Sequence, residues 1–206
     1  MLEIIAMITM LVDHVGLVFF PNEEWLRIIG RIAFPIYAFF LVRGYQKTRN
    51  LKSYTFRLFI IALVAQLPYT YLFKFYQFNV VFTLLVALAA LIILDRIKNK
   101  RKAYLWVGLL IILTTVIPFD YGSYGVILAI IYRYLNMMIG LILHAALNVL
   151  AVYGLQWMDA QLYSVIGTGL LSFYHVMPKV KFNRLFYRSF YPAHIVVLLL
   201  IYQFLH

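Results

Sequence analysis

Apolar residues run almost without interruption from Leu2 to Phe20, and eight comparable apolar runs follow along the chain. A run of about 20 apolar residues is long enough to cross the hydrocarbon core of a bilayer as a helix. Of the 206 residues, 65% are hydrophobic and only 12% are charged. Because a soluble domain of this length has too little interior to bury so many apolar side chains, we expect a membrane protein that crosses the bilayer several times.

The apolar runs also indicate which kind of membrane fold the chain adopts. Lipid offers the backbone no hydrogen-bond partners, so only helices and closed barrels span a bilayer. The runs are continuous and do not alternate with period two, which favours helices over a barrel. We therefore predict an all-α transmembrane bundle in which residues 1–206 form one domain. The predicted spans, about nine in number, are 2–20, 25–43, 54–73, 79–95, 103–119, 121–136, 138–154, 160–174 and 190–205.

Positive charge alternates along the breaks between these spans. The basic breaks are residues 43–57, residues 96–102, Arg133, and the group Lys179, Lys181, Arg184 and Arg188; the breaks between them are acidic or nearly neutral. By the positive-inside rule the N-terminus is cytoplasmic and the C-terminus lies outside. The net charge of +11 is thereby explained by topology. We expect anionic lipid head groups or a phosphorylated cosubstrate as its partners, and no nucleic acid.

Two adjacent ionisable residues, Asp13 and His14, interrupt the first apolar run. An ionisable side chain at membrane depth costs about 2.5–3.5 kcal/mol and persists where it is paired or lines a water-filled cavity. At 1.5 Å per residue, His14 lies about 18 Å along a helix from Leu2, near the bilayer midplane. The pair therefore marks either a path for substrate or protons, or hydrogen bonds that only hold the bundle together.

The second span carries Arg27 and Arg31, which share one helix face because they are four residues apart. Arg27 is expected to extend to the outer membrane surface. Arg31 lies deeper, where its expected partner is Asp13 or an anionic group of a substrate. Gly30 permits a close approach of another helix, and Pro35 can bend the span to open a cavity.

Polar residues recur at helical spacing in the later spans. Each of them, taken singly, is typical of a hydrogen bond between helices. The predicted topology puts the histidines among them near the cytoplasmic side. The pairs are Asn79 with Thr83, His144 with Asn148, and Tyr191 with His194.

His14 is the candidate general base. Asp13 can fix the tautomer of an imidazole, but sequence neighbours on a helix seldom face each other, so Asp13 either orients His14 indirectly or pairs with Arg31. The chain has no cysteine, no serine nucleophile elbow, no phosphate-binding glycine loop and no HExxH zinc motif. Five scattered histidines do not predict a metal site. A base without a protein nucleophile indicates direct transfer to an acceptor.

The sequence resembles the TraX family. The resemblance begins with MLEIIAMITMLVDHVGLVFFP and LRIIGRIAFPIYAFFLVRGYQKTRN. It continues, in the same order, through residues 79–83, 120–126, 144–148 and 191–194. The named member of the family is associated with N-terminal acetylation of conjugative pilin. The family is also similar to the transmembrane acyltransferases, which include the acyltransferase-3 O-acetylases and heparan-glucosaminide N-acetyltransferase. In those enzymes a histidine of the first helix is essential and acetyl-CoA enters from the cytoplasm.

The resemblance implies an acetyl-CoA-dependent O- or N-acyltransferase in the bacterial plasma membrane. His14 would be its base, supported by Asp13 and Arg31, with the acceptor entering from the outer side. His144 and His194 would line the cytoplasmic half of a tunnel. The expected partners are acyl-CoA, membrane lipids and an exported acceptor such as a glycan or a pilin-like protein, with a homodimer as one possible assembly. The candidate CoA- and substrate-binding residues are Arg43, Lys47, Arg49, Lys52, Asn79, Thr83, Asp120, His144, Asn148, Tyr191 and His194. For the first four, lipid binding and topology are the alternative explanation.

Two rival hypotheses remain at this point. In a proton-coupled transporter, Asp13 and His14 would relay protons and Arg31 would bind an anion. In a non-catalytic scaffold, the polar residues would only join helices. A tunnel that narrows at His14 would favour transfer, two alternating gates would favour transport, and the absence of a cavity at His14 would favour the scaffold.

Overall fold

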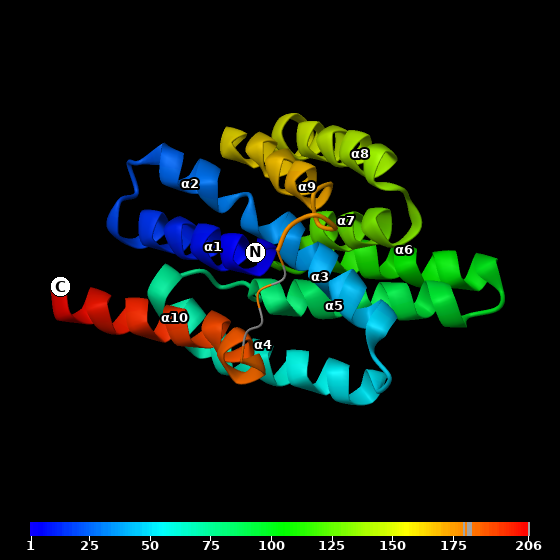
Figure 1. The fold of residues 1–206 in the computed structure, drawn as a ribbon, viewed down its shortest axis with the longest axis horizontal. Helices are drawn as coiled ribbons and strands as arrows, with labels where there is room; N and C mark the ends of the chain where they lie inside the picture. Colours follow the sequence, from blue (N-terminus) through cyan, green and yellow to red (C-terminus); the bar gives the residue numbers. More distant parts are fainter. Residues whose placement is uncertain (179, 181–182, 206) are drawn as a thin grey trace.

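The computed structural model describes residues 1–178, 180 and 183–205, so Lys179 and Lys181 of the last basic break lie outside the described residues. The helices lie roughly along the long axis of the molecule (Figure 1). In chain order the α-helices are α1 (Leu2–Phe19), α2 (Glu24–Gly30), α3 (Ala33–Lys47), α4 (Leu51–Phe73), α5 (Val80–Arg96), α6 (Lys100–Val116), α7 (Gly122–Tyr134), α8 (Met137–Val149), α9 (Val165–Leu171) and α10 (Arg184–Leu205). A π-helical turn, η1 (Leu150–Gly154), continues α8, and a 3₁₀ turn, η2 (Asp159–Ser164), leads into α9.

Each predicted span coincides with a helical stretch, and the all-α membrane bundle is confirmed. In the described part of the chain, five stretches are long and apolar enough to cross a membrane: α1, α2 with α3, α4, α8 with η1, and α10. The helices α5, α6 and α7 are shorter, at 17, 17 and 13 residues. The sidedness of the termini and the count of nine crossings stay predictions.

Asparagines set the start of four helices. The side chains of Asn50, Asn79, Asn99 and Asn136 each accept a hydrogen bond from a backbone N–H two or three residues later. Such a cap satisfies one of the backbone donors that the first turn of a helix leaves without a partner. The caps therefore fix where the chain leaves each connecting segment and enters the next helix.

The second predicted span is broken between Gly30 and Ala33, so α2 and α3 are separate helices. The expected bend thus occurs four residues before Pro35. A proline ring in a helix clashes with the carbonyl group four residues earlier, which here belongs to Arg31. The break leaves Arg31 at the junction of the two helices, facing α1.

The bundle has two parts that meet along a shared face. Helices α5 and α7 pack on α3, and α6 packs on α5 and α7. Helix α8 covers the far side of α7, and α9 covers the far side of α3 (Figure 1). Helices α4 and α10 pack on each other along the opposite edge. Ala62 and Ala65 of α4 and Ile195 and Leu198 of α10 are buried in that contact. Helix α1 lies between the two parts and contacts α2, α3 and α10.

Candidate active site

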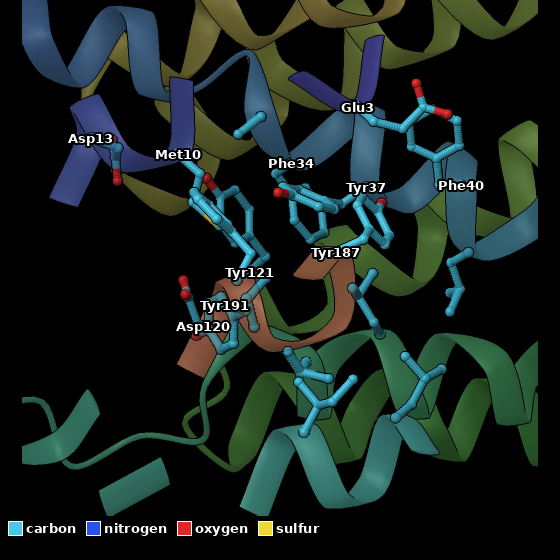
Figure 2. Close-up of a pocket in the computed structure, with 18 of the residues that line it drawn as sticks. Glu3, Met10, Asp13, Phe34, Tyr37, Phe40, Asp120, Tyr121, Tyr187 and Tyr191 are labelled. Atoms are coloured by element: carbon cyan, nitrogen blue, oxygen red, sulfur yellow. The ribbon is translucent and has the colours of Figure 1, made fainter. Parts of the chain in front are cut away.

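A cavity of about 650 Å³ lies between the two parts of the bundle, lined by α1, α2, α3, α4, α5, α10 and the segment before α7. This volume is typical of small-molecule sites. Glu3 and His14 both line the cavity and are eleven residues apart on α1, so it extends about 16 Å along that helix. Figure 2 shows Glu3 and Phe40 at one end, and Asp13 and Asp120 at the other. We call this cavity the chamber.

The end of the chamber near Glu3 is basic. Arg43 and Lys47, in the second half of α3, line it together with Arg57 of α4 and Arg188 of α10. Because Lys47 and Arg188 are exposed, this end opens to the protein surface. Arg43 is partly buried and lies over the ring of Tyr174, 5.5 Å from its centroid.

The other two candidate CoA-binding cations do not line the chamber. Arg49 and Lys52 border a separate surface groove together with Arg96. The chain turns sharply between α3 and α4, where Asn50 caps α4, and this turn carries both side chains to the outside of the bundle. Their assignment to the same binding site as Arg43 and Lys47 is therefore corrected.

At the opposite end, the carboxylate of Asp13 pairs with two arginines. Arg27 donates to Oδ2 of Asp13 at 2.8 Å, and Arg31 donates to Oδ1 at 3.4 Å. The three side chains are only 13–14% exposed. The expected pairing of Asp13 with Arg31 occurs, but the expectation that Arg27 extends to the membrane surface is wrong. Gly30 allows α2 to pack directly on α1, which turns Arg27 towards Asp13.

An aromatic pair supports Arg31 from the other side. Arg31 donates to the hydroxyl of Tyr121 at 3.2 Å, and the ring of Tyr121 stacks on Phe34 with 3.9 Å between centroids. Tyr121 has a φ of 62°, in the left-handed region that non-glycine residues seldom adopt. Backbone strain of this kind is concentrated at functional sites. Here it turns the Tyr121 side chain into the wall of the chamber.

Asp120 also lines the chamber, and backbone hydrogen bonds hold it there. Its N–H donates to the carbonyl of Phe78, and its own carbonyl accepts from the hydroxyl of Thr83. Asn79 is fully buried, caps α5 and donates to the carbonyl of Ala62. Neither Asn79 nor Thr83 lines the chamber, so the structure gives both of them a place in the scaffold and not in a binding surface.

His14 lines the chamber and lies directly against His194. Nδ1 of His14 is 2.7 Å from Nε2 of His194, and the two ring planes differ by 13°. The edge of the His14 ring meets Phe73 at 4.9 Å between centroids. The prediction from the sequence placed these two histidines in different parts of the site, with His194 in the cytoplasmic half of a tunnel. The structure instead puts His194 behind His14, on the face of α10 that packs on α1. Tyr191, one turn earlier, lines the chamber itself.

His144 and Asn148 belong to a second polar group, away from the chamber. The hydroxyl of Tyr124 lies 2.5 Å from Nε2 of His144 and donates to Oδ1 of Asn148 at 2.7 Å. Ser164 and Thr168 complete the group, and all five side chains are at most 2% exposed. We call these five residues the polar cluster. The predictions that His144 lines a tunnel and that Asn148 binds CoA or substrate are corrected, because α8 faces α7 and α9 and is separated from the chamber by α3 and α7.

Among the polar residues that line the chamber, sequence reasoning did not select Arg27, Arg57, Tyr121 or Arg188 as site residues. Two of these could have been identified from the sequence: Arg27 from its four-residue spacing from Arg31, and Tyr121 from its position next to Asp120. No three His, Asp or Glu side chains of the described residues come together as a metal site.

Comparison with known proteins gives a consistent result. A family model described as "TraX protein" matches residues 1–202. A "Probable fimbrial assembly protein FimC, serogroup H1" of Dichelobacter nodosus is 31% identical, over 96% of this chain and 92% of that protein. "Protein TraX" of Escherichia coli is 30% identical, over 64% of this chain and 54% of that protein. No solved structure matches the chain.

Proposed function

The chain belongs to the TraX family, and from this premise we propose that it is a multi-pass acyltransferase that moves an acetyl or other short acyl group from acyl-CoA to an amine or a hydroxyl. The observation that carries the proposal is the chamber, which connects surface cations with a histidine of the apolar helix α1. A relative is named a probable fimbrial assembly protein. That name favours an exported, pilin-like acceptor over a glycan.

The basic end of the chamber fits the phosphates of CoA. Arg43, Lys47 and Arg57 line one opening, and guanidinium and ammonium groups are the usual protein partners of phosphate. Beyond them the wall becomes aromatic and aliphatic, with Tyr37, Leu41 and Leu58. Such a wall suits a thin, weakly polar chain better than a second charged group. The change from a basic opening to an apolar wall supports entry of a CoA thioester from the basic end.

His14 would act as the base at the far end of the chamber. It accepts the proton from the N–H or O–H of the acceptor while the acceptor nitrogen or oxygen bonds to the acyl carbon. As the carbon–sulfur bond breaks, His14 returns this proton to the sulfur, which leaves as the thiol. No acyl group is attached to the protein, in agreement with the absence of cysteine.

The arginine pair beside Asp13 would assist by its charge. Arg27, Arg31 and the carboxylate of Asp13 together carry one net positive charge, and Asp120 lines the same end of the chamber. A fixed positive charge in a site with little water stabilises the oxyanion that develops when an acyl carbon is attacked. Arg31 and Arg27 are therefore proposed to serve the reaction electrostatically, and Asp13 to hold both of them in place.

Transport is the second candidate function. The chamber is lined by Glu3 near one end and Asp120 near the other, which would also suit a path for protons or a polar solute. A cavity at His14 does not support the scaffold hypothesis. Transfer requires binding of acyl-CoA, and transport does not, so the two are separated by one measurement.

That measurement is acetyl-CoA binding and thioester loss by the purified chain in detergent. We would compare the wild type with His14→Ala and with His175→Ala, whose side chain is exposed and outside the chamber. We expect all three to bind, and slow loss of thioester in the wild type and in His175→Ala but not in His14→Ala. Absence of binding by folded wild-type protein would remove the acyl-CoA hypothesis and leave transport.

A further inference from the structure

The hydrogen bonds of His194 determine where the protons of both histidines lie. Nδ1 of His194 is 2.7 Å from the carbonyl oxygen of Phe190. A carbonyl oxygen only accepts, so Nδ1 of His194 carries the hydrogen. In a neutral imidazole the other nitrogen is then an acceptor. Nε2 of His194 therefore offers a lone pair to its neighbour, His14.

The same reasoning extends one step further, to His14. Its Nδ1 lies 2.7 Å from Nε2 of His194 and must donate to it, so Nδ1 of His14 carries the hydrogen. Nε2 of His14 is then the unprotonated nitrogen. It lies on the edge of the ring away from His194, and His14 lines the chamber. The chain of hydrogen bonds runs from His14 through His194 to the carbonyl of Phe190.

We propose that His194 is a positioning residue that holds His14 in the Nδ1–H tautomer, so that Nε2 of His14 is the basic atom presented to the chamber. The inference rests on the proposed function only for what that base does, since the tautomer follows from the hydrogen bonds alone. His194 thus takes the place that a carboxylate occupies beside many catalytic histidines.

The structure explains why Asp13 does not fill that place. The carboxylate of Asp13 is bound to Arg27 and Arg31. His14, the next residue in the sequence, points to a different side of α1. His194 is 7% exposed and lies against both Phe190 and Tyr191, so its ring is fixed before any substrate binds. Nδ1–H of His14 is the only group with which Nε2 of His194 forms a hydrogen bond in the described residues.

The hydrogen bond also has a role after proton transfer. When Nε2 of His14 takes the proton of the acceptor, the ring becomes positively charged and Nδ1–H becomes a stronger donor. Nε2 of His194 then accepts a charge-assisted hydrogen bond, which is shorter and stronger than a neutral one. The positive charge is shared with the second imidazole and, through Nδ1–H of His194, with the carbonyl of Phe190. No oxidant, metal or further proton source is required.

The tautomer is tested without any activity measurement. The chain, labelled with ¹⁵N in its histidine rings and purified in detergent, gives long-range ¹⁵N–¹H correlations that distinguish the two tautomers of each ring. We expect His14 in the Nδ1–H form in the wild type and in His175→Gln. We expect the Nε2–H form, the more stable one for an isolated imidazole, in His194→Leu. An Nε2–H signal from His14 in the wild type would overturn the inference even if His194→Leu does not fold.

The positioning role is tested by acyl transfer, with two substitutions that differ in one property. Gln at position 194 offers an oxygen acceptor to His14, and Leu does not. We expect His194→Leu to lower kcat by about 10²- to 10³-fold, because a wrong tautomer removes general-base catalysis. KM for acetyl-CoA should stay within about threefold of the wild-type value. The kcat of His194→Gln should be at least about tenfold higher than that of His194→Leu.

The two tests separate the two possible failures. If the tautomers are as expected but acetyl-CoA does not bind, the inference about the His14–His194 hydrogen bond is kept and the proposed function is rejected. Equal kcat values for His194→Leu and His194→Gln, both folded, would show that His194 only packs against α1 and would reject the positioning role.

Discussion

Gly30 leaves the space that the carboxylate of Asp13 occupies. A Cβ atom on Gly30 would overlap both the Cβ and the carboxylate of Asp13, and because the Cβ of Asp13 is fixed to the backbone of α1, α1 or α2 would have to shift. This contact, and not a hydrogen bond, brings α2 close enough to α1 for Arg27 and Arg31 to reach the same carboxylate.

We therefore expect Gly30→Ala to destabilise the protein by about 1–3 kcal/mol, as overpacking does in well-packed interiors. The measurement is thermal unfolding in detergent. Gly108→Ala is the control, because a Cβ at Gly108 meets no atom within 4 Å and alanine favours a helix over glycine. Gly108→Ala should unfold at the wild-type temperature or above it. Equal unfolding temperatures for both variants would contradict the close packing of α1 and α2.

Asp13→Asn should be strongly destabilising. The substitution leaves Arg27 and Arg31 beside each other, little exposed, with no carboxylate between them. Breaking a buried pair by removing one partner costs about 3–5 kcal/mol, which is the upper limit here because the three side chains are still 13–14% exposed. The double variant Asp13→Asn with Arg27→Gln should regain part of the loss, and chemical unfolding would show it.

The control for Asp13→Asn is Asp95→Asn. Asp95 pairs with Arg133 at 3.0 Å, but these side chains are 24% and 29% exposed. Such a pair contributes about 0–1 kcal/mol. Similar losses for both aspartates would mean that water screens the Asp13 pair as well as the Asp95 pair.

Arg43→Gln and Arg49→Gln should affect acetyl-CoA differently, although both remove one cation from the same basic break. Arg43 lines the chamber and Arg49 borders the separate groove. A hydrogen bond to a charged group contributes about 1.5–3 kcal/mol, so Arg43→Gln should raise KM for acetyl-CoA by roughly 10- to 100-fold. Arg49→Gln should change KM less than about twofold, and a larger effect of Arg49→Gln would move the phosphate site to the groove.

Tyr124→Phe should lower stability without affecting binding. The lost hydroxyl contacts His144, Asn148 and Ser164, which are fully buried and would each lose one hydrogen-bond partner. A buried hydrogen bond contributes about 0.5–1.5 kcal/mol net, and the remaining bonds among these residues keep the cost in that range. Binding of acetyl-CoA by calorimetry should be unchanged, because the polar cluster does not line the chamber. Tyr104→Phe, at a position 65% exposed, should change neither quantity, and weaker binding in Tyr124→Phe alone would connect the polar cluster to the chamber.

The helices were predictable because each apolar run is itself the signal for a span. The break in the second span was predictable as a bend, since a proline acts on its own helix. The position of the Arg27 side chain was not predictable. A long, positively charged side chain tends to reach the membrane surface only where lipid lies beside it. Whether α1 or lipid lies there depends on Gly30, and a glycine in a sequence does not say which helix approaches it.

The hydrogen-bond partners of His144 and His194 could not be predicted from the sequence either. Spacing shows that His144 and Asn148 share a face of α8 but not that this face meets α7 and α9. His14 and His194 are 180 residues apart and come together only because α10 packs back on α1 and α4. The candidate base, His14, could be named from one helix, whereas the tautomer proposed for it depends on a second helix.

The polar cluster has a mechanical consequence for the chamber. Directional hydrogen bonds join α7, α8 and α9, so these helices cannot slide past one another without breaking several at once. Helices α4 and α10 meet through Ala62, Ala65, Ile195 and Leu198, and apolar contacts of this kind have no fixed direction. The helices behind α3 are therefore joined more rigidly than α4 and α10, which form one wall of the chamber. Widening for a bulky acceptor would strain the α4–α10 wall first, and that wall also carries His194.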